Sequence, residues 1–242
     1  MRLNPDGIRF FAGRYLEPRL TWLKRHDLAW AEPSEAEFVC PIEFVAAPIG
    51  WIKCSLTLTS PPAQLGRETH VLVGVRTLPL YCPAADVLDV GIKRGHGLRA
   101  RLSTFRHLWA IGSGAGDEVA AELAQAVEEQ WPAAVKRIGT PEGVANEIEH
   151  EAERDIGWLE TLAYSRVLAG DIAGAGRSIA RVLRDPNRTG AVNLRATQIN
   201  RVLLNPTAAA DRLAEWRQER LEAEGLLALA APRVALETTD PL

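Results

Sequence analysis

Two histidines in the first half of the chain are the side chains whose chemistry first suggests catalysis. His96 lies in the basic, glycine-rich stretch Gly91–Arg101, and His107 follows it in the next apolar segment. A neutral imidazole can act as a general base near pH 7, and a basic loop rich in glycine can also bind an anion. No Asp or Glu is tied to either histidine by spacing. They are the catalytic candidates, and the alternative interpretation of Gly91–Arg101 is an exposed loop between strands.

A second glycine-rich segment, residues 110–118, has the order of strand, turn and helix start that a phosphate-binding loop requires. It lacks the Lys-Ser or Lys-Thr pair that follows such loops, and Asp117 and Glu118 would place carboxylates where a phosphate should bind. Ser113 also lacks the glycines, two residues before and after it, of a nucleophile elbow. We interpret this segment as a connection that leads into a helix, and we predict no cofactor.

The cysteines do not form a metal-binding or disulfide pattern. Cys40, Cys54 and Cys82 are odd in number, and no Cys-x-x-Cys or His-x-x-x-His spacing accompanies them. Cys40 and Cys54 fall on apolar faces of predicted strands, where free cysteine usually serves as a small core residue. We therefore predict reduced thiols and no metal site.

Charge is unevenly distributed along the second half of the chain. Residues 117–160 contain twelve acidic and three basic side chains, whereas residues 166–201 contain seven arginines and two aspartates. Within the basic segment the spacing i, i+4, i+7, i+11 predicts one helical face carrying Arg177, Arg181, Arg184 and Arg188. Such a face can bind an acidic protein surface or phosphates. The alternatives are a solvated stripe or internal salt bridges to the preceding acidic segment.

The totals limit the classes of protein to which the chain can belong. Its 242 residues are 47% hydrophobic and 24% charged, values typical of a globular protein, with a net charge of -3. A slightly acidic chain does not devote its whole surface to nucleic acid or anionic lipid. Neither a continuous apolar signal segment nor a membrane-spanning run is evident. We therefore expect a soluble cytoplasmic protein without a membrane partner.

The first 138 residues predict an α+β domain. Asn4-Pro5-Asp6 has the capping chemistry of a helix start. Alternating apolar residues then predict a β-hairpin, with strands near 38–44 and 52–59 around the turn 47–50, followed by strands at 69–80 and 98–111. The last of these needs a bulge near Ser103 to keep its alternation. The prediction is an N-terminal helix and a four-stranded antiparallel sheet with covering helices.

Helical periodicity dominates after Asp117. It predicts one helix ending near Pro132, another opening at Thr140-Pro141, and a last one over Ala208–Gly225. The expected organisation is an α+β domain over residues 1–138, an α-helical C-terminal region over 139–230, and a tail over 231–242.

A helical hairpin is predicted over Trp158–Asn187, with a Gly170-Asp171 turn. Its small and apolar positions resemble the tetratricopeptide repeat; they are Leu162, Ala163, Ala175, Ile179 and Val182, with Asp185-Pro186-Asn187 closing the hairpin. The proline comes one residue early, and the usual aromatic is displaced to Tyr164. Ala209, Leu213 and Trp216 lie 34 residues after Ala175, Ile179 and Val182, which suggests a faint second copy of the repeat. The resemblance covers about thirty residues and implies protein–protein interaction. Any antiparallel helix pair with small residues at its crossing gives the same pattern.

These observations favour a non-catalytic cytoplasmic protein-binding factor, of a regulatory or immunity type. It would use the hairpin and the arginines against a partner with an acidic surface. Two alternatives stay open. One is a hydrolase or transferase for a small molecule, with its site between the sheet and the helices near His96 or His107. The other is a nucleic-acid-binding protein, which the net charge and the few base-reading side chains in the hairpin disfavour.

Overall fold

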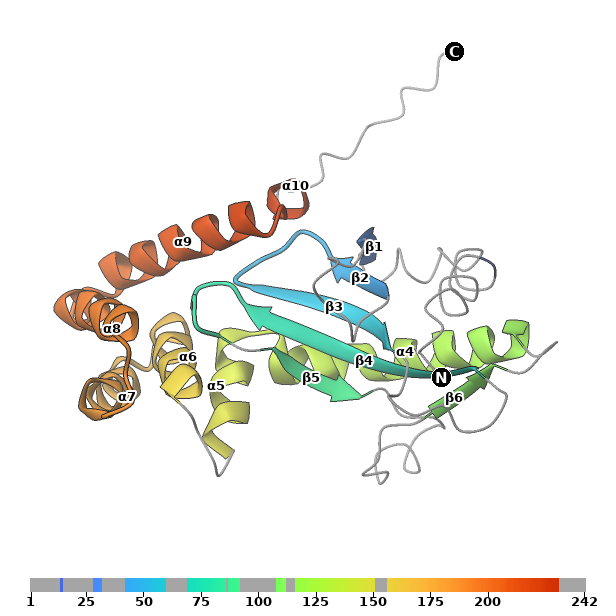
Figure 1. Ribbon diagram of the computed structural model, residues 1–242, viewed down its shortest axis with the longest axis horizontal. Helices are drawn as coiled ribbons and strands as arrows, with labels where there is room; N and C mark the ends of the chain where they lie inside the picture. Colours follow the sequence, from blue (N-terminus) through green and yellow to red (C-terminus); the bar gives the residue numbers. More distant parts are fainter. Residues whose placement is uncertain are drawn as a thin grey trace, which may run out of the picture.

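The computed structural model describes Arg14 and residues 28–31, 42–59, 69–85, 87–91, 108–111, 116–150 and 156–230. Within these residues the chain forms one six-stranded antiparallel sheet followed by a series of helices (Figure 1). The strands are β1 (Leu28–Ala31), β2 (Ile42–Ala46), β3 (Ile52–Thr59), β4 (Thr69–Pro79), β5 (Leu88–Gly91) and β6 (Leu108–Ile111). They pair in the order β1-β2-β3-β4-β5, and β6 also pairs with β4. The α+β class with an antiparallel sheet is confirmed.

The predicted hairpin is β2 and β3, in which Phe44 lies opposite Leu56. Of the predicted strands at 69–80 and 98–111, the first is β4, and the described part of the second is β6. The structure adds β1 and β5 to these four strands. Both added strands have only four residues, too few for alternation to indicate them. The predicted N-terminal helix and the bulge near Ser103 lie outside the described residues.

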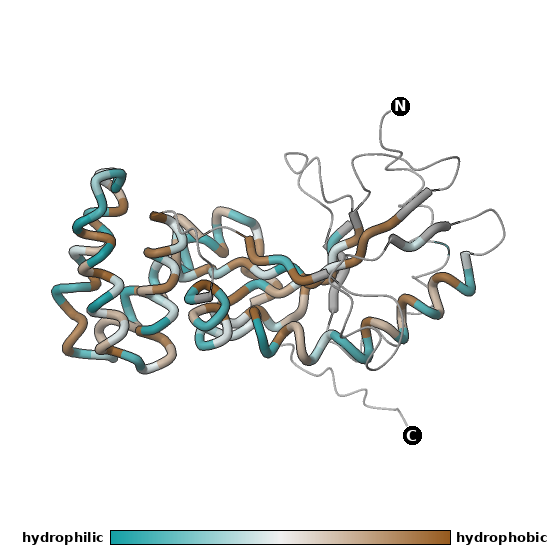
Figure 2. The backbone as a smooth tube through the Cα atoms, turned by 90° about the horizontal axis from the view of Figure 1, so that it is seen from below, coloured by the Kyte–Doolittle hydropathy of each residue, from teal (hydrophilic) through white to brown (hydrophobic). Residues whose placement is uncertain are grey.

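The two faces of the sheet differ in chemistry. Along β3, Ile52, Cys54, Leu56 and Leu58 lie in the main hydrophobic core together with the valines of β4, Val71, Val73 and Val75. The intervening residues of β3, Lys53, Ser55 and Thr57, lie on the opposite face. Figure 2 shows the apolar positions along the central strands. The period of two therefore separates an apolar face from a polar one.

Helix α4 (Gly116–Ile138) covers the apolar face of the sheet. The prediction that it ends near Pro132 is wrong, because the helix continues for another six residues. Pro132 is exposed, whereas Trp131, Ala134 and Ile138 are buried. A proline inside a helix costs about 3 kcal/mol, but burial of a large apolar side chain such as Trp131 before it or Ile138 after it contributes about 1.5–3 kcal/mol. Packing on the sheet thus outweighs the helix-breaking tendency.

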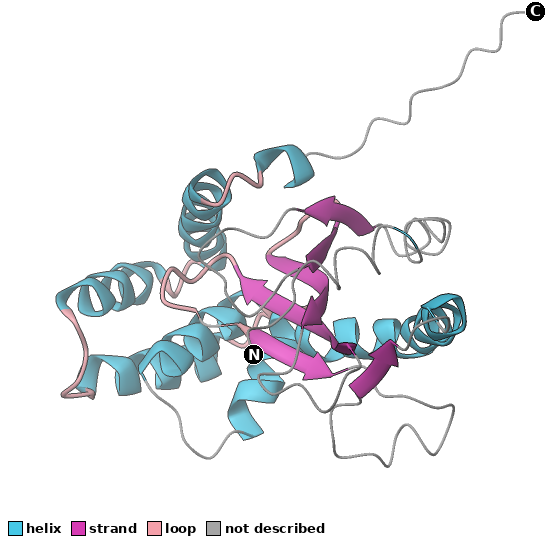
Figure 3. Cartoon of the chain, turned by 45° about the vertical axis from the view of Figure 1, so that its right-hand side comes forward, coloured by secondary structure: helices cyan, strands magenta, loops and turns pink. Residues whose placement is uncertain are grey.

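The remaining helices are α5 (Pro141–His150), α6 (Ile156–Leu168), α7 (Ile172–Arg184), α8 (Gly190–Val202), α9 (Pro206–Ala223) and the short α10 (Leu227–Ala230). Of these, α6, α7 and α8 lie at one end of the molecule, and α9 runs from that end back along the sheet to α10 (Figures 1 and 3). The predicted start at Thr140-Pro141 is confirmed, since the Thr140 hydroxyl accepts a hydrogen bond from the Gly143 amide at 3.0 Å. The predicted last helix corresponds to α9, with Asn205 as its N-cap.

One buried core connects the sheet to the helical region. It runs without a break from Phe44 on β2 through α4, α5 and α6 to Trp216 on α9. A smaller cluster lies on the opposite side of the sheet, where Val45 and Leu78 contact Leu221 and Leu226 near the end of α9. The sheet and the C-terminal helices therefore stabilise each other and are packed as one unit.

Candidate functional site

The predicted helical hairpin is α6 and α7. Gly170 has φ of +82°, a left-handed conformation that lets the chain reverse after α6. Asp171 then caps α7, because its carboxylate accepts a hydrogen bond from the Gly174 amide at 2.8 Å. Ala163 and Ala175 are completely buried between the packed helices. The small residues and the Gly-Asp turn thus have the structural roles expected from the sequence.

The outer face of α7 carries three of the four predicted partner-binding arginines. Arg177, Arg181 and Arg184 are all exposed, and in the described part of the chain none of their guanidinium groups takes part in a hydrogen bond or an ion pair. Helix α7 itself contains no acidic residue. It lies at the end of the molecule, with α8 as its neighbour (Figure 1). The result is a cationic surface of three guanidinium groups.

The fourth arginine is not on this helix. Asp185 ends α7 with extended backbone, and Pro186 follows, so Arg188 lies in the connection to α8. Its guanidinium donates hydrogen bonds to the Asp185 carbonyl at 2.8 Å and to the Asn193 side chain at 3.2 Å. Arg188 is exposed, but these bonds hold it against the loop. The continuous four-residue helical stripe is thus shortened to Arg177, Arg181 and Arg184.

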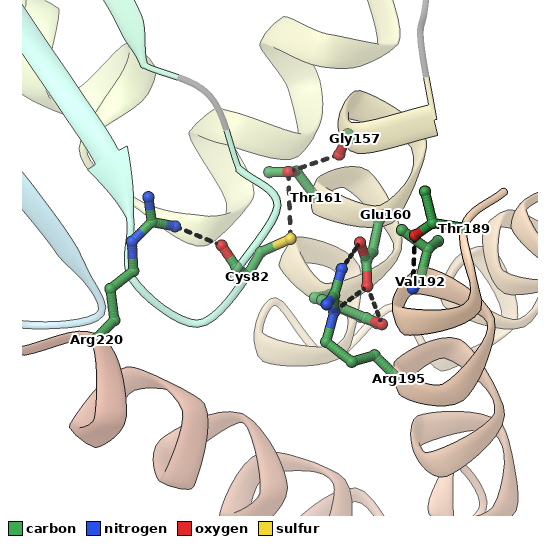
Figure 4. A network of polar contacts seen from close by, with 9 residues as sticks. Cys82, Gly157, Glu160, Thr161, Thr189, Val192, Arg195 and Arg220 are labelled. Atoms are coloured by element: carbon green, nitrogen blue, oxygen red, sulfur yellow. Dashed lines mark hydrogen bonds and ion pairs between the residues drawn. The ribbon is translucent and has the colours of Figure 1, made fainter. Parts of the chain in front are cut away.

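Other arginines of the helical region hold the fold together. Arg195 on α8 forms a bidentate ion pair with Glu160 on α6, with both nitrogen–oxygen distances at 2.8 Å (Figure 4). Glu160 has no exposed surface, and its carboxylate also accepts a hydrogen bond from the Tyr164 hydroxyl at 2.8 Å. The hydrogen bond to Glu160 raises the pKa of Arg195 above its ordinary value. This pair fixes α6, the first helix of the predicted hairpin, against α8.

Tyr81 and Cys82, which follow β4, connect the sheet to α6. The Tyr81 hydroxyl lies 2.7 Å from the Ser165 hydroxyl, and Thr161 donates to the Cys82 sulfur at 3.5 Å. Burial raises the pKa of Tyr81 and raises that of Cys82 to about 12, with the nearby Glu160 charge adding to the effect on Cys82. Burial likewise raises the pKa of Cys54 to about 12. Both thiols are neutral core groups at physiological pH, as predicted, and Cys40 lies outside the described residues.

A polar cavity of about 210 Å³ opens between the polar face of the sheet and α9. Glu43 on β2 and Lys53 on β3 form an ion pair of 3.1 Å at its floor, and Ser55 donates to the same carboxylate at 2.5 Å. Arg76 on β4 also lines it. These polar groups are largely withdrawn from water: Ser55 is 1% exposed and Glu43 is 9% exposed.

Arg220 on α9 and Glu224, which caps the C-terminal end of that helix, form the other wall of this cavity. Arg220 donates to the carbonyl of Cys82 at 2.6 Å (Figure 4), and one turn earlier Arg217 donates to the carbonyl of Ile49 at 2.7 Å. Partial burial lowers the pKa of Arg217. Two loops of the sheet are thus fixed to α9, so the cavity has walls that do not depend on a bound ligand.

The predicted catalytic histidines, His96 and His107, lie outside the described residues, as do residues 112–115 of the glycine-rich connection. Asp117 and Glu118 begin α4, which follows β6 in the expected order of strand, connection and helix. In the residues that the structure does describe, no cluster of three His, Cys, Asp or Glu side chains is arranged to hold a metal ion. None of the helices placed here has the length and apolar character to cross a bilayer.

Comparison with protein-family models, with curated proteins and with solved structures finds no significant match.

Sequence reasoning missed the cavity and helix α8. Lys53 and Ser55 were recognised only as the polar positions of an alternating strand, and alternation cannot distinguish a solvated face from one covered by a distant helix. The spacing i, i+4, i+7 of Val192, Ala196 and Ile199, all buried, was the signal that could have indicated α8.

Proposed function

We propose that this protein is a non-catalytic binding factor that captures a protein partner with an acidic surface on α7. The observation that carries the proposal is the contrast between two groups of arginines. Arg195, Arg217 and Arg220 are bound to carboxylates or carbonyls of the chain itself. Arg177 and Arg181 have no such partner among the described residues and are exposed.

The packing of α7 against the rest of the fold also supports this role. The helix is fixed on its inner side by Ala175, Ile179 and Val182, which are fully buried, so its outer face needs little ordering when a partner binds. Arg201 on the adjacent α8 is another exposed cation without a partner in the described part of the chain. A carboxylate-rich surface fits such a patch, because each guanidinium presents paired donors that match a carboxylate.

The test is affinity capture from the source cell with the full chain as bait. Reversing two charges with Arg177→Glu and Arg181→Glu should abolish recovery of a protein that the wild type captures. The double variant Lys136→Glu with Arg212→Glu makes the same change in net charge at exposed positions on α4 and α9, and it should retain that protein. Unchanged thermal melting of both variants shows that the fold is intact. Equal capture by the two double variants would refute a role for α7.

A nucleic-acid partner is distinguished in the same experiment. Phosphates would bind the same guanidinium groups, but the affinity would then fall steeply with salt. Retention of the wild type on a DNA or heparin column at low salt, lost in the Arg177→Glu and Arg181→Glu variant, would replace the acidic protein by a polyanion.

The small-molecule enzyme stays as a second candidate because of one observation, the polar cavity between the sheet and α9. It lies between the sheet and a helix, but His96 and His107, which were expected beside such a site, lie outside the described residues. Ser55 supplies a hydroxyl group to the cavity and donates its hydrogen bond to the Glu43 carboxylate. That carboxylate is already paired with Lys53. Loss of a measured hydrolase or transferase activity in Ser55→Ala, with the fold unchanged, would support this candidate over the binding factor.

A further inference from the structure

We infer that the cavity between the polar sheet face and α9 is a binding site for a small anion that carries a carboxylate or a phosphate group. This inference is independent of the partner surface on α7, which lies on a different helix.

The burial of charge at the cavity floor is the first argument. An ion pair largely withdrawn from water, such as that of Lys53 with Glu43, whose side chains are 14% and 12% exposed, is often less stabilising than well-packed apolar residues of similar size. Apolar packing is available to both faces of this sheet: the main core covers one face, and on the face of the cavity Val45 and Leu78 are buried against Leu221 and Leu226. Polar groups that converge on a cavity, where apolar packing would serve the fold, are the usual mark of a ligand site.

The balance of donors and acceptors is the second argument, and it defines the charge of the ligand. Three cationic side chains and two carboxylates line the cavity. Both Glu43 oxygens are already engaged, by Lys53 and by Ser55. Lys53 has three N–H donors, and Glu43 is its single partner within the described chain. Two ammonium donors therefore remain for an acceptor group, which an anion supplies.

Size and access limit the ligand further. A volume of about 210 Å³ corresponds to about seven water molecules at about 30 Å³ each. This is enough for a carboxylate or phosphate with a short carbon chain. Leu78 and Ala85 provide an apolar side for that chain, and Val87, 38% exposed, lies at the rim. The site thus fits a small metabolite rather than a polymer.

The experiment measures binding of inorganic phosphate and of short-chain carboxylates, acetate and succinate, to the full chain by calorimetry at constant ionic strength in chloride. We expect saturable one-site binding of phosphate or of a carboxylate, and whichever binds identifies the group. Lys53→Met, which keeps the aliphatic stem and removes the charge, should weaken that binding at least tenfold. The matched control Lys136→Met changes an exposed lysine on α4, across the sheet, and should bind like the wild type.

A second variant covers the case in which Lys53→Met does not fold. Val87→Trp leaves every charge in place and narrows the entrance at a rim position, so it should abolish binding while the thermal midpoint without ligand stays unchanged. Two results would overturn the inference. One is the absence of saturable binding for all three anions at ligand concentrations up to about 10 mM. The other is equal binding by the wild type, Lys53→Met and Val87→Trp. Because the arginines on α7 are unchanged in these proteins, partner capture is unaffected by either outcome.

Discussion

Replacing Arg195 by methionine removes the cation that neutralises a carboxylate without any exposed surface. Two hydrogen bonds of 2.8 Å join Arg195 to Glu160, and the arginine side chain is only 17% exposed. Two unit charges 4 Å apart attract each other by about 4 kcal/mol at an effective dielectric constant of 20. Removal of one partner of a buried pair usually costs about 3–5 kcal/mol, because the remaining charge stays desolvated.

The Arg195→Met variant should therefore lose about 3 kcal/mol of unfolding free energy at pH 7, because it leaves the Glu160 carboxylate desolvated and without its guanidinium partner. Urea unfolding followed by circular dichroism at pH 7 measures this loss. The control is Arg212→Met, which breaks the exposed pair of Arg212 with Glu215 on α9 and should change the free energy by less than about 0.5 kcal/mol. The double variant Glu160→Leu with Arg195→Met should recover most of the loss. A cost below about 1 kcal/mol for Arg195→Met, or a cost no larger than that of Arg212→Met, would refute the view that the pair neutralises a buried charge.

Two further predictions concern the turn and the thiols. Gly170→Ala places a Cβ at φ +82° and should lower the free energy of unfolding in urea by about 1–2 kcal/mol. The control Gly190→Ala, at an open position in the first turn of α8, should leave that free energy unchanged or raise it. Equal effects of the two substitutions would contradict the argument from φ. The pKa values of Cys54 and Cys82 are raised to about 12, so the stability that they contribute is complete below about pH 9 and lost as the pH rises toward 12. Peptide mapping after iodoacetamide treatment at pH 8 should find both cysteines unmodified until urea unfolds the chain, and modification of either in the native protein would show that it is accessible.

Much of the local structure could be predicted from the sequence, because it depends on short-range physics. The period of two in β3 and the capping groups of α5 and α7 act over a few residues, and the structure confirms the elements that they indicate. The spacing that placed Arg177 and Arg181 on one helical face also acts within a single helix. The four-residue strands β1 and β5 were missed because they are too short to show a period.

The tertiary structure decided the features that depend on contacts between distant residues. Helix α4 continues past Pro132 because Trp131 and Ile138 are buried where the helix packs on the sheet. Glu160 meets Arg195, and Lys53 lies in a cavity walled by α9, because helices from the end of the chain pack on earlier elements. Sequence alone determines which side chains are charged and on which face of an element they lie. Whether a charge remains exposed, as on α7, or is neutralised inside the fold depends on what packs against it, and that is a property of the whole chain.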